Sequence, residues 1–468
     1  MSMLPFDTDI FPFKTGVYVV GGSVRDLLAE RMPYDYDLVV DRDWTHFASR
    51  LGAMTGGHIV ELGKQNQKML RVITRDRIYD IMPVNGSSIE NDLRLRDFTI
   101  NAMALDLSTG SLIDPLGGQT DLAAKKIRMI SRDVFRKDPV RLIRAYRMAA
   151  NFDLDIDENT RAAIAADGNR IQESAGERIR EELFKILQCP RSHSYLSMMD
   201  QGGLLVHIFP EFLKLKQLQV QPAAPRTWFE QTFDSYFHLE TLLNPDGGLM
   251  RSMDSRFFQN DPVTRSIILK WSVLFHNLGR LPAKQPADNA IIDYSDEHAA
   301  RSAAMAQVIC RRLRFSRRQS DTIEMVIRHH FQPMVLFSAH RQNSPVEKEF
   351  IRLFLDCTDV TPDVLLSALA EFKGRKGADD PLTDEFAGFI RMLIQTTDRV
   401  LRPRAALPPP INGNDLINEF GMKPSAEFRL ILERIEEERL AKESYSRADA
   451  LRLVEYLLGR RGRFPEKK

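Results

Sequence analysis

The chain has 468 residues, a formal net charge of +1, 43% hydrophobic residues and 28% charged residues. This composition is typical of globular proteins and excludes disordered and collagen-like classes, and no apolar run approaches the roughly 20 residues that a membrane-spanning helix needs. The length predicts two to four domains of roughly 100–200 residues each, and the near-zero charge means that any surface for an anionic partner must be local.

The N-terminal part predicts a small mixed sheet with helices. Short runs rich in Val, Ile and Leu predict strands at 16–20, 37–40, 58–62, 69–74 and 78–82. Helical spacing predicts helices at 23–31 and 44–51, and Ser23 followed by Asp26 resembles a capping pair at the start of the first helix.

The pattern changes near residue 138, where long amphipathic stretches replace the short strands. Helical periodicity predicts helices at 139–150, 177–187, 266–276, 297–313 and 320–330. The Pro-rich run at 405–410 predicts a stiff linker or turn before a last helical segment. We therefore expect an α+β fold, with a mixed sheet followed by an all-helical remainder.

A glycine pair separates the first predicted strand from the first predicted helix. Gly21 and Gly22 let the backbone approach a ligand closely, and the helix start at Ser23 presents free N–H groups to an anion. Arg25, in the first turn, could reach a phosphate. An ordinary tight turn explains the same glycines, so this feature does not identify a site by itself.

Two carboxylates open the second strand. Because side chains alternate along a strand, Asp35 and Asp37 share one face. Two carboxylates held together repel each other unless a cation lies between them, and Mg²⁺ favours such oxygen ligands together with phosphate oxygens. Two metal ions there would activate an attacking hydroxyl and stabilise a leaving pyrophosphate. A solvated turn with scattered acids is the alternative, and the adjacent glycine unit disfavours it.

A third acid, Asp80, lies among apolar neighbours in the predicted strand 78–82. A carboxylate is costly to bury without a partner. We therefore expect Asp80 to be a third catalytic carboxylate, either a metal ligand or an orienting acid. An outward-facing residue at a sheet edge is the alternative.

These features occur together in a known family. The run 21–26 followed by Asp35-Tyr36-Asp37 resembles the signature of the tRNA nucleotidyltransferase and poly(A) polymerase family, the bacterial-type (class II) CCA-adding enzymes of the polymerase-β-like superfamily. Four further blocks follow in the family's order at 96–102, 114–122, 137–145 and 177–183. The resemblance is strong over residues 16–187 and looser after them.

The resemblance implies a nucleotide pocket. Its second block is implied to recognise the ribose and line the pocket, and its third to act as a hinge. The residues implied to bind the nucleotide are Gly21, Gly22, Arg25, Arg96, Asp97, Asn101, Asp138, Arg141 and Arg144. One departure is Leu95, where many members have an arginine.

The fourth block has a physical reading of its own. On a helix, Asp138 and Arg141 would be i and i+3 and share one face, so that an acceptor and a donor could pair with the edge of a nucleobase. The resemblance implies that this pair selects CTP and ATP. An intrahelical ion pair is the alternative that spacing alone favours. Lys137 stands where members usually carry an acid, and the selecting pair itself is retained.

Four domains follow from these patterns. We expect a polymerase-β-like nucleotidyltransferase domain at 1–135, a helical nucleotide-selecting neck at 136–195, an HD-like helical domain at 196–340 and a helical RNA-binding tail at 341–468. The run His276-Asn277-Leu278-Gly279-Arg280 resembles the central block of HD phosphohydrolases, with His238 and His298 near the flanking positions. Asn277 replaces the metal-binding Asp, so we expect this domain to lack hydrolase activity.

Local basic clusters predict an RNA surface. The candidates are Arg178, Lys373, Arg375 and Lys376, with further clusters at 311–318, 402–404 and 460–463. They could contact phosphates of a tRNA acceptor arm and elbow, which would make binding salt-sensitive. A solvated helix face is the alternative for any one cluster.

The expected activity is template-independent addition of CMP and/or AMP from CTP and ATP to tRNA 3′ ends. The run 81–91 is short, and in this family a shortened loop there accompanies enzymes that add only CC and leave the final A to a separate A-adding enzyme. Full CCA addition, A addition, poly(A) synthesis, an inactive RNA-binding protein on this fold and an HD phosphohydrolase are the alternatives. Both acids of the DxD pair argue against inactivity, and Asn277 argues against the hydrolase.

The cysteines favour a reducing compartment. Cys189, Cys310 and Cys357 are widely spaced and form neither a CxxC pair nor a disulfide framework. The N-terminus lacks a basic stretch followed by an apolar stretch, as a secretory signal would have. We therefore expect a cytoplasmic protein.

Overall fold

The structure is a computed structural model that describes residues 8–63, 68–220, 225–244, 261–281 and 296–459. It divides into two compact units, Met1–Pro210 and Glu211–Lys468. The sheet and the helices that follow it as far as residue 210 form the first unit, and the second unit is helical. The finer division into four domains stays a prediction.

A seven-stranded mixed sheet forms the centre of the first unit. Its strand order is β3-β4-β5-β2-β1-β6-β7, with β2 parallel to β5 and the other neighbours antiparallel. The strands are β1 (Val17–Val20), β2 (Asp35–Val40), β3 (His58–Leu62), β4 (Met69–Ile73), β5 (Ile78–Pro83), β6 (Ala104–Asp106) and β7 (Leu112–Ile113). The five strands expected from the sequence are confirmed, and β6 and β7 were not predicted.

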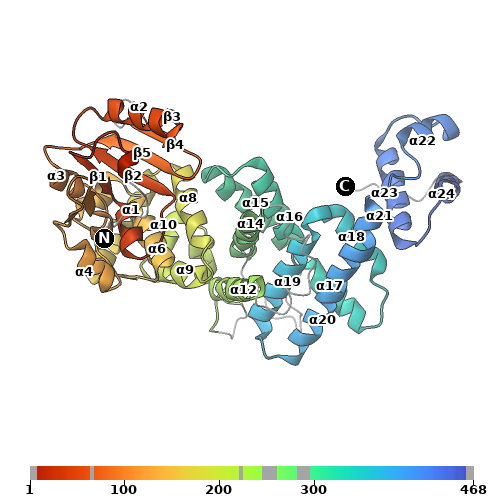
Figure 1. Ribbon diagram of the computed structural model, residues 1–468. Coiled ribbons are helices and arrows are strands. Elements are labelled where there is room, and N and C mark those ends of the chain that lie inside the picture. The colour runs from red at the N-terminus through yellow and green to blue at the C-terminus, as the bar shows by residue number, and fades with distance from the viewer. Residues whose placement is uncertain (1–7, 64–67, 221–224, 245–260, 282–295, 460–468) are drawn as a thin grey trace. The chain divides into compact units, whose positions relative to one another are not determined.

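The two faces of β2 have different neighbours, as the alternation of strand side chains requires. Tyr36, Leu38 and Val40 join the core beneath α2 (Trp44–Thr55), which lies alongside β3 and β4 in Figure 1. Val39 packs on the opposite face with a smaller apolar cluster. Asp35 and Asp37 therefore emerge on the face that α2 does not cover.

Helices complete the first unit. They are α1 (Gly22–Leu28), α3 (Ile89–Leu93), α4 (Gly118–Ala123), α5 (Asp133–Lys137), α6 (Arg141–Phe152), α7 (Glu158–Asp167), α8 (Gly176–Leu187), α9 (Ser192–Gln201) and α10 (Leu204–Ile208), with 3₁₀ turns at Thr8–Ile10, Thr99–Asn101 and Gly168–Glu173. Strands β8 (Lys126–Ile127) and β9 (Asp155–Ile156) form a short parallel pair. Strand β9 is an exception to the helical pattern expected after residue 138.

The second unit is helical in its described residues, apart from an isolated antiparallel bridge between Gln219 and Thr227. Its helices are α11 (Phe212–Gln217), α12 (Trp228–Leu243), α14 (Pro262–Phe275), α15 (Asp296–Arg312), α16 (Arg317–His329), α17 (Gln332–Arg341), α18 (Glu347–Cys357), α19 (Thr361–Lys376), α20 (Pro381–Thr396), α21 (Arg402–Ala405), α22 (Gly413–Phe420), α23 (Ala426–Ala441) and α24 (Arg447–Gly459). Shorter turns are η5 (Thr358–Val360) and η6 (Thr397–Leu401). In the parts that the structure describes, no helix combines the length and apolar character that crossing a bilayer requires.

Helix α19 is the centre of the second unit. It is buried on all sides over most of its length, and it packs against α12, α14, α16, α17, α18 and α20 (Figure 1). The Pro-rich run at 405–410 separates α21 from α22, as the sequence predicts. The last helices form a separate apolar cluster around Leu416, Ile431 and Val454.

The predicted start of α1 is wrong in its detail. Gly21, not Ser23, is the N-cap residue, and no side chain caps the helix. The Ser23 hydroxyl instead donates to the Asp35 carbonyl oxygen at 3.2 Å and accepts from the Asp37 N–H at 3.0 Å. A tertiary contact has replaced the expected local cap, and it ties α1 to β2.

Candidate active site

The glycine turn joins the end of β1 to α1 in a conformation that favours glycine. Gly21 has a φ of 68° and a ψ of −130°, and it directly follows the last residue of β1. A Cβ atom at this position would lie 2.6 Å from Nη1 of Arg96 and 3.4 Å from Oδ2 of Asp37. The missing side chain therefore lets an arginine and a carboxylate approach the turn.

The structure places both acids of the DxD pair at this turn. In β2, Asp35 is exposed, Tyr36 is buried and Asp37 is half-buried, so the two carboxylates lie on the same face. The Ser23 hydroxyl fixes the backbone at Asp35 and Asp37, and Asp37 adjoins Gly21. Strand alternation and the glycine pair together made this arrangement predictable.

Asp80 lies directly beside Asp37, because β2 and β5 are parallel and these two residues are register partners. Its side chain is buried, with 8% of the residue exposed. Arg71 of β4 donates to both Asp80 oxygens at 2.7 Å, from Nε and from Nη2. This arginine, which the sequence analysis missed, compensates the buried charge. A catalytic role for Asp80 stays a prediction.

Electrostatics at the site favour a cation. Burial raises the pKa of Asp37 to about 6; Arg96 opposes this, and the negative charges of Asp80 and Asp35 add to it. A divalent ion between the carboxylates would remove that repulsion. Among the described residues, no group of three or more His, Cys, Asp or Glu side chains is placed to hold a metal. The pair suits Mg²⁺, which commonly takes one or two carboxylates and completes its shell with phosphate oxygens and water.

The second block forms a polar network below the turn. Asp97 is buried and accepts hydrogen bonds from the Phe98 N–H at 2.8 Å and from Asn101 at 2.9 Å. Arg25 donates to Asn101 at 2.5 Å. Burial opposes ionisation of Asp97, but Arg144 and these hydrogen bonds outweigh it and lower its pKa. A charged Asp97 thus holds Arg25 through Asn101.

The same network continues into α6 and α8. Arg144 of α6 donates to Asp97 at 3.3 Å and to Glu182 of α8 at 3.2 Å, and Arg147 donates to Glu182 at 2.5 Å. Glu182 is buried and therefore depends on both arginines. Sequence reasoning had placed Glu182 in the fifth block without a role. Glu182 lies one helical turn from Ile179 and from Ile186, on the apolar face of α8. This spacing in the sequence could have indicated that Glu182 is buried.

Asp138 and Arg141, the pair expected to select the base, lie together but not on one helix. Asp138 is the C-cap of α5 with extended backbone angles (φ −150°, ψ 91°), and α6 begins only at Arg141. The helix-face prediction is wrong because Pro139 disfavours helical angles in the residue before it. Asp138 Oδ2 still lies 3.7 Å from Arg141 Nε, across the start of α6.

Arg178 of α8 is the closer partner of Asp138. Its two terminal nitrogens donate to the two carboxylate oxygens at 3.0 and 2.8 Å. Burial opposes ionisation of Asp138, but the hydrogen bonds and charge of Arg178 lead the effects that lower its pKa. Arg178 therefore fixes the Asp138 carboxylate, and the expected contact of Arg178 with RNA stays a prediction.

The Asp92 carboxylate joins the two ends of the short loop after β5 through hydrogen bonds. Asp92 is buried, accepts from the Asn85 N–H at 3.1 Å, and accepts from Arg96 Nε and Nη2 at 3.2 and 3.0 Å. This residue was not predicted to matter. It connects the loop to the arginine that lies against Gly21.

The HD-like residues meet in a buried cluster of the second unit. The ring centroid of His330 lies 5.2 Å from that of His276 and 5.4 Å from that of His298. Glu371 of α19, which sequence reasoning missed, lies 3.3 Å from His330 Nε2. His238 stays outside and packs against Phe237.

Two arginines, Arg280 and Arg375, lie beside the Glu371 carboxylate in this cluster. Arg280 donates to the Asn277 amide oxygen at 3.0 Å and lies 3.8 Å from Glu371, and Arg375 lies 3.5 Å from the same carboxylate. Two guanidinium groups beside the carboxylate disfavour a divalent cation there. The absence of hydrolase activity stays a prediction that this arrangement supports.

The basic cluster at 373–376 is only partly at the surface. Lys376 is exposed and Lys373 is half-buried. The Arg375 side chain is 7% exposed and faces Glu371, so it does not offer a phosphate contact. The cluster at 460–463 lies outside the described residues.

Gly21→Ala tests the turn. Because the φ and ψ of Gly21 fall where residues with a Cβ are strained, we expect the substitution to lower the free energy of unfolding by about 1–3 kcal/mol and to displace Arg96. Denaturant unfolding and nucleotide incorporation measure the two effects. Gly203→Ala is the control, because φ is +72° there and nothing lies within 4 Å of the added Cβ. Equal incorporation by the two variants would contradict the role of the turn.

The mixed sheet, the glycine turn and the DxD pair form the arrangement that the sequence resemblance implies for a polymerase-β-like nucleotidyltransferase. Residues 17–128 match the family described as the poly(A) polymerase head domain, and residues 153–215 match a "Probable RNA and SrmB- binding site of polymerase A". Over these two segments the chain has the domains of the poly(A) polymerase family, as the sequence motifs indicate.

Named relatives differ in the nucleotides they add. A CC-adding tRNA nucleotidyltransferase of Geobacter sulfurreducens is 39% identical over 195 residues, which span 42% of this chain and 45% of that protein. An A-adding tRNA nucleotidyltransferase of Deinococcus radiodurans is 28% identical over 443 residues, 92% of each chain.

Solved structures share the fold along the chain. An apo form of a CCA-adding enzyme has a TM-score of 0.66 at 22% identity and covers 96% of this chain and 92% of its own. A CCA-adding enzyme with CTP (TM-score 0.65, 21% identity, 94% and 91%) and the Thermotoga maritima CCA-adding enzyme with tRNA (TM-score 0.62, 22% identity, 94% and 91%) are similar to it.

Proposed function

We propose that this protein adds CMP and/or AMP, taken from CTP and ATP, to the 3′ end of tRNA and releases pyrophosphate. The observation that carries the proposal is the position of Asp35 and Asp37 on one face of β2 at the Gly21-Gly22 turn. Asp138 and Arg141 in the same unit supply an acceptor and a donor for a base. Relatives named tRNA nucleotidyltransferases and a similar structure with tRNA support the substrate class.

The residues divide the reaction between them. Asp35 and Asp37, when ionised, would hold Mg²⁺, which in such sites polarises the attacking 3′ hydroxyl and stabilises the leaving pyrophosphate. Ser23 fixes the spacing of the two carboxylates through the backbone of β2. Arg96, held by Asp92, keeps positive charge at the turn, where a triphosphate would add negative charge.

Base selection follows from hydrogen-bond chemistry. Cytosine and adenine each carry an amino donor beside a ring-nitrogen acceptor on the edge used for pairing. Uracil and guanine present a carbonyl and a ring N–H instead. A carboxylate acceptor beside a guanidinium donor matches the first pattern and leaves the second unpaired. Asp138 and Arg141 therefore favour CTP and ATP, with the protein in the place of a template.

We further propose CC addition as the subtype, with a separate enzyme adding the terminal A. The short loop between β5 and α3, closed by Asp92, supports this. Relatives of both kinds are similar to the chain, so the assay must decide.

We expect tRNA lacking its 3′ end to gain two C residues with CTP and nothing further when ATP is added. Sequencing the products with CTP, ATP or both gives the result. A terminal A would overturn the CC-only subtype and leave the family activity intact. Long A tracts would indicate a poly(A) polymerase, and no extension under any condition would overturn the proposed function.

A further inference from the structure

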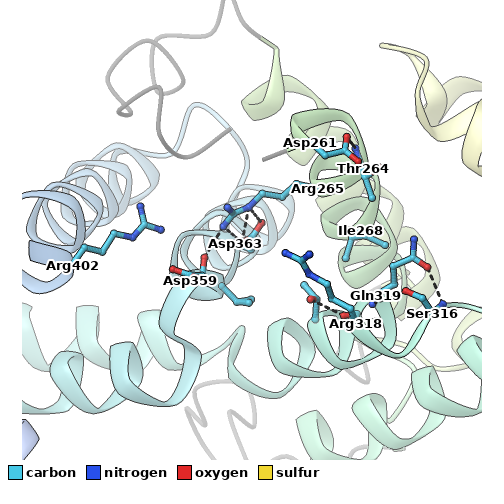
Figure 2. A pocket seen from close by; sticks show the side chains of 12 residues that line it. Asp261, Thr264, Arg265, Ile268, Ser316, Arg318, Gln319, Asp359, Asp363 and Arg402 are labelled. Carbon is cyan, nitrogen blue, oxygen red and sulfur yellow. Dashed lines mark hydrogen bonds and ion pairs between the residues drawn. The ribbon is translucent and has the colours of Figure 1, made fainter. Parts of the chain in front are cut away.

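A cavity of about 850 Å³ lies in the second unit, apart from the HD-like cluster. Its walls come from the starts of α14, α16 and α19 and from α21, as Figure 2 shows. The lining residues are Asp261, Thr264, Arg265, Ile268, Ser316, Arg318, Gln319, Thr322, Asp359, Val360, Asp363 and Arg402. Three arginines from three different helices thus face one space.

Two acids of the wall, Asp261 and Asp363, are held by hydrogen bonds, and Asp359 lines the cavity as a third acid. Asp261 caps α14 by accepting from the Thr264 N–H at 3.1 Å. Asp363 is 3% exposed and accepts from Arg265 Nε at 3.1 Å with each oxygen. Arg265 also donates to the Asp359 carbonyl oxygen at 2.7 Å, which fixes its guanidinium in the wall.

Two further arginines direct donors into the cavity. Arg318 is exposed at the start of α16, and its guanidinium points into the cavity in Figure 2. Arg402 donates to Asp398 at 2.7 Å from Nη1, and its side chain, which is 25% exposed, lines the cavity.

We propose that this cavity is a binding site for a phosphate group, with Arg318 as the principal contact and Arg402 as the second. Guanidinium groups bind phosphate through charge-assisted hydrogen bonds. The first turns of α14 and α16 add partial positive charge to the same space. The phosphate comes either from a small free anion or from an RNA phosphodiester, and only the RNA source rests on the proposed function.

The test uses the full chain and a matched pair of variants. Arg318→Gln removes one charge inside the cavity. Arg317→Gln removes one charge from the neighbouring residue, whose side chain is 95% exposed and which does not line the cavity. Hydrogen exchange of the backbone amides at 316–320 is followed with inorganic phosphate, and separately with a tRNA acceptor stem–loop, at constant ionic strength.

We expect at least one probe to slow exchange at these amides. Arg318→Gln should weaken that probe about tenfold, as loss of a charge-assisted contact does, and Arg317→Gln should change it less than about twofold. An effect with phosphate alone assigns a small anion, and an effect with the stem–loop assigns RNA. No protection by either probe, or equal weakening by both variants, would overturn the proposal. The phosphate arm needs no catalysis, so it succeeds or fails independently of the proposed function.

Discussion

Replacing Asp37 with Asn is expected to reduce nucleotide incorporation by about a thousandfold or more, because a metal ion contributes several kcal/mol to stabilising such a transition state. The neutral amide keeps the size of the side chain but is a poor ligand for Mg²⁺. Asp35→Asn should act in the same direction. Single-turnover incorporation of CMP from CTP into tRNA measures the loss, and filter binding should show that tRNA affinity is largely retained.

The control for Asp37→Asn is Asp41→Asn, which makes the same charge change just beyond the end of β2, where the side chain is exposed. Asp41→Asn should leave incorporation within about twofold of the original protein. Near-normal incorporation by Asp37→Asn would defeat the metal assignment. An equal loss in both variants would show that the charge of the strand, rather than its position at the turn, matters.

A stability measurement separates lost chemistry from lost structure in the Asp37→Asn variant. Burial raises the pKa of Asp37 from 3.8 to about 6, so the folded state binds a proton more tightly than the unfolded chain does. The stability that this proton gives is complete below pH 3.8 and is lost as the pH rises through about 6. Asn cannot ionise. At pH 8 without Mg²⁺, the free energy of unfolding of the variant should therefore be about 3 kcal/mol higher than that of the original protein.

The position of the DxD acids could be read from the sequence because it depends on local geometry. Residues two positions apart on a strand have side chains on the same face, so Asp35 and Asp37 share a face of β2. The glycine pair marks the turn that follows the neighbouring strand β1. Burial could not be read in the same way. Asp80 depends on Arg71, which is its register partner in β4, and register depends on the whole sheet.

Long-range clusters escaped prediction for a related reason. Glu371 lies far along the chain from His276 and His298, and it joins them only because α19 is buried on all sides. Arg375 lies four residues after Glu371 on the same helix face and is buried with it. The basic run around Arg375 resembles a surface cluster in the sequence, but the Arg375 side chain belongs to the core. The prediction that Asp138 lies on a helix was wrong for a local reason that the sequence shows: Pro139 follows it directly and disfavours helical backbone angles at Asp138.

Asp138→Ala is expected to lower discrimination against UTP and GTP by about 10- to 100-fold, which matches the roughly 1–3 kcal/mol of a bidentate base contact. The loss should appear mainly as faster incorporation of the wrong nucleotides and weaker use of CTP, because the carboxylate is the acceptor for the amino group. Competition assays with paired nucleotides measure it. Unchanged rejection of UTP and GTP would contradict the assignment of Asp138.

Arg178→Ala should give a smaller effect of the same kind, because it acts through Asp138. Both oxygens of Asp138 lie at 2.8–3.0 Å from Arg178 but only one lies within 3.7 Å of Arg141, so Arg178 determines where the carboxylate points. Without it we expect a several-fold rise in KM for CTP, with kcat changed less, since the catalytic acids are untouched. Arg191→Ala removes an equally charged but exposed ion pair with Asp153 and should change neither. If Arg178 served only RNA binding, its loss would instead raise KM for tRNA and leave nucleotide selection as it was.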